Sequence, residues 1–333
     1  MLKTILRRVK QILIFTALVS TALVLISCAS IDYFTNPLNS ENNHTNEISL
    51  ITYNIKAIYD KEENEIDSLS SFIYRENFDF VVFQELFDES TRDEIVEKMN
   101  TKYQTIISRV DYNSFPEFLF QDAGLFLMSK YPRIDLSTTD FGDDINNSNG
   151  VIHMVLEKEW SKTNDFLANK SVVGTLFNVN DSTQVFLFAT HVQAIGTLEH
   201  KLFQLDQINN FINTAVDGVI SSGKVNSEKN LVVLLAGDFN SNAYSPERYA
   251  LFKSHLGRPR DLHKEFHGEK EEYTFKFRSG RPSRRFDYIL AYDSIPKYSF
   301  KKVSVKSIGV HDVKVDSVSI SDHIALKAKL IIK

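Results

Sequence analysis

Residues 231–240 read Leu-Val-Val-Leu-Leu-Ala-Gly-Asp-Phe-Asn, and this stretch decides the fold. Its first six residues are all apolar, which is typical of a strand buried on both faces in an α/β protein. Asp238 and Asn240 follow, and both point to one side because side chains alternate in direction along a strand. Two polar groups at the end of a buried strand indicate a functional site rather than a simple turn.

Five other apolar runs end in side chains that are costly to bury unless they are paired or bound to metal. These runs place Asn54 in ITYNI (51–55), Glu85 in VVFQE (81–85), His191 in ATHVQA (189–194), Asp287 in FDYI (286–289), and Asp322 with His323 in SDH (321–323). Strands of one sheet bring distant positions of the chain to a common edge. We therefore expect all six motifs to line a single site.

The spacing of apolar residues predicts an α/β protein. Strand-length runs rich in Val, Ile, Phe and Tyr occur at 48–55, 79–85, 124–129, 150–156, 171–179, 184–192, 231–236, 286–292, 301–310 and 324–332. Helical spacing predicts helices at 63–76, 88–100 and 198–216, and a shorter one at 247–255. Ten strands and a few helices in one domain predict a four-layer sandwich, in which two packed β-sheets are flanked by helices.

The start of the chain predicts export and a lipid anchor. Residues 1–27 combine four basic residues with the apolar run 12–26, as in a signal peptide. The run ends in Leu-Ile-Ser before Cys28, which resembles the lipobox of bacterial lipoproteins, where that cysteine is lipidated. Residues 28–47 are then the lipidated cysteine and a flexible tether, and residues 48–333 form one domain. The alternative is an uncleaved anchor helix. Both predict a bacterial cell envelope protein, at the inner or the outer membrane.

The charge argues against a nucleic-acid partner. The chain has 38 Lys and Arg against 43 Asp and Glu, a net charge of −5, and loss of the signal makes it more negative. A nonspecific nucleic-acid binder needs a basic face, and only small basic clusters occur, at 258–260 and 278–285. Cys28 is the single cysteine, so disulfides cannot stabilise the domain, which must rely on its core. We expect the protein to be a monomer.

The polar motifs contain the side chains that metal-assisted phosphoester hydrolysis uses. Glu85 is a hard oxygen ligand of the kind that Mg²⁺ prefers, and Asn54 adds a neutral oxygen. Asp287 can fix the tautomer of the His323 imidazole and raise its basicity, and His191 is a second imidazole at the same edge. Each also has a structural interpretation when taken alone: Glu85 as a solvated acid, Asn54 as a turn residue and His323 as a buried, hydrogen-bonded ring.

At these motifs the chain resembles the endonuclease/exonuclease/phosphatase superfamily, over almost all of residues 48–333 and in the family's order. Within it, the chain is most similar to the bacterial and neutral sphingomyelinase branch. The matching segments are QELFD (84–88), Gly124 through SKYP (129–132), THVQA (190–194), Gln204-Leu205 and FDYIL (286–290). The resemblance implies a catalytic domain that requires Mg²⁺, with Mn²⁺ or another divalent cation as alternatives.

The resemblance also implies which residues bind metal. Glu85 is the principal ligand, with Asn54 nearby. Asp238 positions the phosphoryl group or a second cation, and Asp322 completes the network on the metal side. Whether one or two metal ions bind stays open.

For catalysis, the resemblance implies that His323 is the general base that activates water and that Asp287 holds it. Asp238 and Asn240 position the phosphoryl group, while His191 stabilises charge on the phosphoryl oxygens or the leaving group. Whether Asp238 or His323 takes the proton first stays open.

The predicted function is hydrolysis of a phospholipid headgroup at a membrane surface, with sphingomyelin cleaved to ceramide and phosphocholine as the first choice. The alternatives are a nuclease or phosphatase acting on nucleotides or phosphoinositides, and a non-catalytic surface lipoprotein that binds lipid or host. Two features depart from the sphingomyelinase branch. Residues 301–320 lack the aromatic-tipped β-hairpin, and Asn149-Gly150 stands in place of Lys-Gly. The segment FPEFLF (115–120) is another candidate for membrane contact, or it packs as an ordinary loop.

Overall fold

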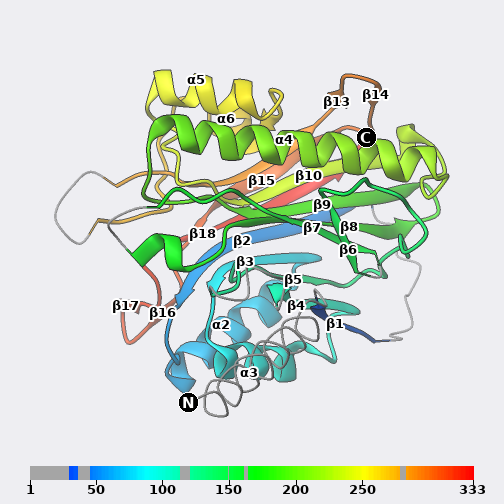
Figure 1. The fold of residues 1–333 in the computed structure, drawn as a ribbon. Coiled ribbons are helices and arrows are strands. Elements are labelled where there is room, and N and C mark those ends of the chain that lie inside the picture. The colour runs from blue at the N-terminus through cyan, green and yellow to red at the C-terminus, as the bar shows by residue number, and fades with distance from the viewer. Residues whose placement is uncertain (1–29, 37–45, 113–120, 149, 161–163, 278–282) are drawn as a thin grey trace, which may run out of the picture.

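The fold is an α/β sandwich of two β-sheets with helices on the outer faces (Figure 1). This confirms the predicted four-layer architecture. The structure is a computed structural model, which describes residues 30–36, 46–112, 121–148, 150–160, 164–277 and 283–333. The predictions for the signal peptide, Cys28, residues 115–120 and Asn149 fall outside the described residues.

The first sheet carries Asn54 and Glu85 on neighbouring parallel strands. Within the described residues it has seven strands in the order β1-β4-β5-β3-β2-β18-β15. Strands β2 (Glu47–Ala57) and β3 (Phe80–Leu86) are parallel, and β18 (Ala325–Ile332) pairs antiparallel with β2. The others are β1 (Ser30–Thr35), β4 (Thr105–Tyr112), β5 (Phe126–Ser129) and β15 (Val303–His311). Parallel pairing brings the ends of β2 and β3 to one edge.

The second sheet carries His191, Asp238 and Asp287. Its described strands follow the order β11-β12-β10-β9-β8-β7-β6. Strand β10 (Leu231–Asp238) pairs parallel with β9 (Thr183–His191) and antiparallel with β12 (Asp287–Tyr292). The remaining strands are β11 (Arg260–Asp261), β8 (Ser171–Asn180), β7 (Val151–Val155) and β6 (Asn146–Ser148). Two small hairpins pair β13 (Ser294–Ile295) with β14 (Tyr298–Ser299) and β16 (Lys314–Val315) with β17 (Val318–Ser319).

Helices form the two outer layers. Helices α2 (Glu63–Glu76) and α3 (Glu89–Met99) cover the first sheet, and α4 (Leu198–Ser221) lies across the second, with α5 (Pro246–His255) and α6 (Leu262–His267) on the same side (Figure 1). Short 3₁₀ turns occur at Asn164–Leu167 and Glu228–Asn230. Side chains cap several helices: Asp88 accepts a hydrogen bond from the backbone of α3, and Thr197 does so for α4.

Three apolar layers hold the sandwich together. Leu50 on β2 and Leu234 on β10 belong to the core between the two sheets. Their neighbours Ile51 and Leu235 point the opposite way, toward the helices on each side. Because both faces of the central strands are buried, the strands read as continuous apolar runs.

The predicted helices and all ten predicted strands form within a few residues of their expected ends. Strands β1, β4 and β6, helix α6 and the two-residue strands β11, β13, β14, β16 and β17 are not predicted. Strand β4 escapes prediction because Ser108, Arg109 and Asp111 interrupt its apolar pattern. Strand β1 lies within the expected tether (28–47) and pairs with β4 at the sheet edge, so the fold begins before residue 48. None of the described helices is both long and apolar enough to cross a membrane.

Arg285 and Asp261 form a completely buried ion pair, with Nη2 and Oδ2 2.6 Å apart. We expect Arg285→Ala to lower the free energy of unfolding by about 3–5 kcal/mol, because Asp261 would keep an unpaired charge away from water. Denaturant unfolding monitored by circular dichroism measures this. As a control, Lys297→Ala removes an exposed ion pair with Asp217 and should change the value by less than about 1 kcal/mol. Equal losses in the two variants would contradict the expectation.

Candidate active site

The six polar motifs meet at one edge of the sandwich. In the second sheet, strand register places His191, Asp238 and Asp287 side by side on three adjacent strands. In the first sheet, Asn54 and Glu85 lie near the ends of adjacent parallel strands. The two sheets are in direct contact here, since Asn54 Nδ2 donates a hydrogen bond to Asp238 Oδ2 at 3.1 Å.

Asn54 bridges two carboxylates that are assigned to metal binding. Besides its bond to Asp238, its Nδ2 donates to Glu85 Oε1 at 2.9 Å. The Asp238 side chain is 1% exposed, whereas that of Glu85 is 23% exposed. Burial raises the pKa of Asp238 to about 7, against the opposing charge of His323. Two carboxylates, of which that of Glu85 reaches solvent, suit Mg²⁺, which keeps several waters. The Asn54 amide turns its nitrogen toward them, while its Oδ1 accepts the backbone N–H of Lys56 at 3.2 Å.

His323 lies between two carboxylates. Its Nδ1 is 2.9 Å from Asp287 Oδ2, and its Nε2 is 3.5 Å from Asp238 Oδ2. Burial alone would lower the pKa of His323, but the charges of Asp287 and Asp238 outweigh it and raise the pKa to about 10. The three groups lie close enough together to ligate an ion. The imidazole occupies the space between the two carboxylates and holds a proton, an arrangement that suits proton transfer.

His191 is a buried imidazole, and neither ring nitrogen has a hydrogen-bond partner among the described residues. Its Nε2 lies 3.8 Å from Glu85 Oε1 and 3.7 Å from Asp238 Oδ2. Burial lowers the pKa of His191 well below its usual value, so the ring is neutral. Buried polar atoms nearly always have a partner in a folded protein. The ring therefore suits a bound ligand at this position.

The backbone around the site is strained. φ is 51° at Lys56, 54° at Glu85 and 47° at Asn240, in the left-handed region. For residues other than glycine such conformations cost on the order of 1–3 kcal/mol, and they cluster at functional sites. Gly237 approaches β9 so closely that a Cβ would lie 2.0 Å from the Thr190 carbonyl oxygen. Only glycine fits at that position.

Two predicted site residues contact groups outside the carboxylate cluster. Asn240 Nδ2 donates to the Val192 carbonyl oxygen at 2.9 Å and so ties the end of β10 to the end of β9. The Asp322 carboxylate forms an ion pair with the Lys56 ammonium. Asp322 therefore balances the charge of a lysine beside the site.

Two lysines near the cluster were not predicted from the sequence. Lys56 follows Asn54 by two residues, and that spacing on a strand is a signal that would have identified it. Lys201 donates to the carbonyl oxygens of Ala194 at 2.6 Å and Asn240 at 3.4 Å. No pattern in α4 marks Lys201, since its position depends on how the helix meets the end of β9.

Two glutamines of the matched motifs build the loop that follows His191. Gln204 Oε1 accepts the backbone N–H of Gln193 at 3.0 Å, and its Nε2 donates to the Glu157 carbonyl oxygen at 2.7 Å. Gln193 Nε2 donates to the Ile195 carbonyl oxygen at 2.8 Å. Both side chains are buried, so their contribution is to hold the loop in place.

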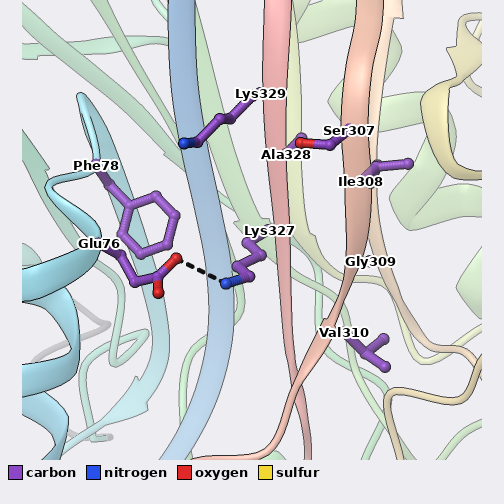
Figure 2. Close-up of a pocket in the computed structure, with 9 residues that line it drawn as sticks. All are labelled: Glu76, Phe78, Ser307, Ile308, Gly309, Val310, Lys327, Ala328 and Lys329. Carbon is purple, nitrogen blue, oxygen red and sulfur yellow. Dashed lines mark hydrogen bonds and ion pairs between the residues drawn. The ribbon is translucent and has the colours of Figure 1, made fainter.

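A separate cavity of about 320 Å³ lies between the end of α2 and the strands β15 and β18 (Figure 2). The ion pair between Glu76 and Lys327, 2.7 Å long, lies across it. None of the predicted site residues lines this cavity.

Comparison with known sequences does not assign the chain to a family, since no family model matches it. An uncharacterized protein of Dictyostelium discoideum is 27% identical over 184 residues, which cover 51% of this chain and 14% of that protein. The chain thus spans less than two thirds of the length of that relative.

Solved structures match the whole sandwich. Sphingomyelinase C from Streptomyces griseocarneus has a TM-score of 0.58 and 17% identity, and the match covers 85% of this chain and 99% of that chain. TDP2 from D. rerio, complexed with single strand DNA product, has a TM-score of 0.58 and 15% identity, covering 85% and 98%. A mutant beta toxin from Staphylococcus aureus with bound magnesium ions has a TM-score of 0.57 and 18% identity, covering 85% and 99%.

A further structural match names the fold. An endonuclease/exonuclease/phosphatase family protein from Bacteroides thetaiotaomicron also matches, with a TM-score of 0.53 and 14% identity, covering 86% of this chain and 98% of that one. At these identities the likeness shows the fold alone. The chain therefore has the endonuclease/exonuclease/phosphatase fold.

Proposed function

We propose that the protein is a metal-dependent phosphodiesterase that hydrolyses a phospholipid headgroup, with sphingomyelin as the substrate and ceramide and phosphocholine as the products. The proposal rests on one observation. The His323 imidazole lies between Asp287 and Asp238. Glu85 is next to this group, since both Glu85 and Asp238 contact His191, so a proton-transfer group and a cation ligand share one site. The sphingomyelinase among the structural neighbours supports the substrate class.

Glu85 and Asp238 would hold the cation through hard carboxylate oxygens, and we propose Mg²⁺. Asn54 would orient both carboxylates through its Nδ2, because its Oδ1 accepts the backbone N–H of Lys56. The neighbour with bound magnesium supports this choice. A cation held there would supply positive charge, which would stabilise the phosphoryl oxygens and oppose the raised pKa of His323.

The remaining side chains move the proton and hold the substrate. Asp287 holds the Nδ1 edge of His323, so Nε2 faces Asp238 and the attacking water. Beside Asp238, His323 takes the proton of that water at Nε2 as the water oxygen bonds to phosphorus. The bond from phosphorus to the ceramide oxygen breaks, and the proton passes from His323 to that oxygen. The neutral ring of His191 donates to a phosphoryl oxygen. The Lys56 ammonium, paired with Asp322, lies beside the site.

Exposed apolar side chains around the site support a lipid substrate. Ile58 and Tyr59 follow β2, and Ile195 and Leu198 follow β9, so all four lie on segments that continue from site strands. Trp160 is exposed as well. Such side chains suit contact with a lipid surface. We propose that they approach the membrane, and that a lipid on Cys28 keeps the protein there.

The test is phosphocholine release. The full chain, purified in detergent, should release phosphocholine from sphingomyelin in mixed micelles with Mg²⁺, and EDTA should stop the release because the phosphoryl charge loses its counter-ion. Fresh Mg²⁺ should restore it. A choline-coupled assay follows the product. Folded protein that releases none with Mg²⁺ present would exclude sphingomyelin as the substrate.

A nuclease or phosphatase is the second candidate, because TDP2 with its DNA product matches the sandwich as well as the sphingomyelinase does. Plasmid DNA, a phosphoinositide and sphingomyelin, compared under one condition, separate the candidates. The non-catalytic alternative is disfavoured because Glu85, Asp238 and His323 all retain their polar groups and converge.

A further inference from the structure

A second cluster of metal-binding side chains lies outside the candidate active site. His263 and His267 are four residues apart on α6, so they lie on the same side of the helix. Glu272 follows in the next loop, with Oε2 3.3 Å from His263 Nε2 and 3.6 Å from His267 Nε2. The exposed fractions of the three side chains are 1%, 12% and 17%. The cluster is therefore largely removed from water.

The spacing of these atoms fits a tetrahedral metal ion. Ligand bonds of about 2.0–2.1 Å at tetrahedral angles separate two ligand atoms by roughly 3.3–3.4 Å. The separations measured from Glu272 Oε2 are close to this value, and all three ligand atoms lie within 4.8 Å of one another. Two imidazoles and a carboxylate are a known zinc ligand set, with the fourth position open to water.

The surroundings hold Glu272 in the position that a metal needs. The Tyr244 hydroxyl donates to the Glu272 carbonyl oxygen and accepts from its backbone N–H, both at 2.7 Å. Lys270 binds the outer oxygen Oε1 at 3.0 Å, which leaves Oε2 for the imidazoles. Strand β15 passes the carboxylate at Gly309, where a Cβ would lie 3.7 Å from Oε2. Figure 2 shows Gly309 on this strand without a side chain.

Two contacts must be exchanged when metal binds. The first is the hydrogen bond between His263 Nε2 and Glu272 Oε2, which metal bonds from both atoms replace. His267 Nε2 lies 2.9 Å from the Ile308 carbonyl oxygen, a hydrogen bond that requires a proton on Nε2. With the proton on Nδ1 instead, the Nε2 lone pair is free to bind a metal. The metal bond then replaces the hydrogen bond to Ile308.

We propose that His263, His267 and Glu272 bind a zinc ion, separate from the cation at Glu85. Imidazole nitrogen suits zinc and other late transition metals, whereas Mg²⁺ prefers oxygen ligands. The two sites thus select different metals. This inference does not depend on which phosphoester the protein hydrolyses.

The zinc ion would restrain the segment that supports the catalytic imidazole. Two residues after Glu272, Thr274 Oγ1 accepts the backbone N–H of Asp287 at 3.1 Å. The ring of the next residue, Phe275, packs against the ring of His323, with the two ring centroids 4.8 Å apart. Zinc bound to both α6 and Glu272 would fix the start of segment 272–275. Because Thr274 and Phe275 contact Asp287 and His323, the zinc site positions these two residues without touching substrate.

The test is titration of the metal-free full chain, in detergent with excess Mg²⁺, first with Co²⁺ and then with Zn²⁺. Tetrahedral Co²⁺ absorbs visible light strongly, so it reports the geometry directly. We expect one Co²⁺ per chain and its displacement by one Zn²⁺. His267→Gln and Glu272→Gln should weaken Zn²⁺ binding by more than about tenfold. His255→Gln, at a histidine paired with Asp206, and Glu85→Gln should leave it unchanged.

Two outcomes would overturn the proposal: wild-type protein without a tetrahedral Co²⁺ spectrum, or unchanged Zn²⁺ affinity in both ligand variants. The partly exposed ligands are tested because replacing the buried His263 also disturbs packing. Hydrogen exchange tests the restraint. Zn²⁺ should slow exchange of the Asp287 amide in the wild type and not in His267→Gln. Equal exchange with and without Zn²⁺ in the wild type would refute the positioning role.

Discussion

Replacing His323 with alanine is expected to lower the turnover number by about 10²–10⁴-fold, the range that general acid–base catalysis contributes. The imidazole lies between two carboxylates, with Nδ1 2.9 Å from Asp287 Oδ2 and Nε2 3.5 Å from Asp238 Oδ2. Alanine leaves no base between these carboxylates. Single-substrate kinetics on the full chain measure the loss. Added imidazole should restore part of the activity, because the vacated space admits a free base.

The matched control is His255→Ala, a partly exposed histidine that pairs with Asp206. It should keep wild-type turnover, and circular dichroism should show that both variants fold. If His323→Ala instead keeps near-wild-type turnover, the base is misassigned and Asp238 becomes the candidate proton acceptor.

Glu85→Gln is expected to lower turnover by about 10³-fold or more. The carboxamide keeps the shape of the side chain but removes the charge that we propose holds the cation. A 10³-fold loss corresponds to roughly 4 kcal/mol of transition-state stabilisation. The Mg²⁺ dependence of turnover provides the specific readout. The variant should require a much higher Mg²⁺ concentration for half-maximal activity.

Glu269→Gln is the control for that change, since Glu269 is an exposed loop carboxylate. It should leave both turnover and the Mg²⁺ dependence unchanged. Wild-type Mg²⁺ dependence in Glu85→Gln would show that the cation binds elsewhere.

Most of the fold was predictable because its central strands are buried on both faces. Runs such as Leu231–Ala236 favour interior strands because they are short, contain β-branched residues and end at a glycine. The edge elements were harder. Strand β4 is interrupted by polar residues, and β1 sits in a polar stretch, where pairing with β4 outweighs local composition. Helix α6 is only six residues long, too short to show a period.

The site was predictable to the extent that strand ends carried it. Register in the second sheet aligns His191, Asp238 and Asp287. Polar residues at the ends of apolar strands predict that these side chains lie at one edge. The ion pair between Lys56 and Asp322 was not foreseen, since it joins residues 266 positions apart. The hydrogen bond from Asn240 to the Val192 carbonyl oxygen depends on the left-handed backbone at Asn240. The residue type alone does not predict that conformation.

The left-handed backbone at Lys56 and Glu85 bears on how the molecule would respond to selection. Glycine at either position would relax the chain by about 1 kcal/mol, because it has no Cβ to clash. The same change would remove the ammonium or the carboxylate. Directed evolution that scores heat resistance alone would therefore favour glycine at these two positions and lose side chains that we propose for the site. Any such programme has to select for turnover in every round.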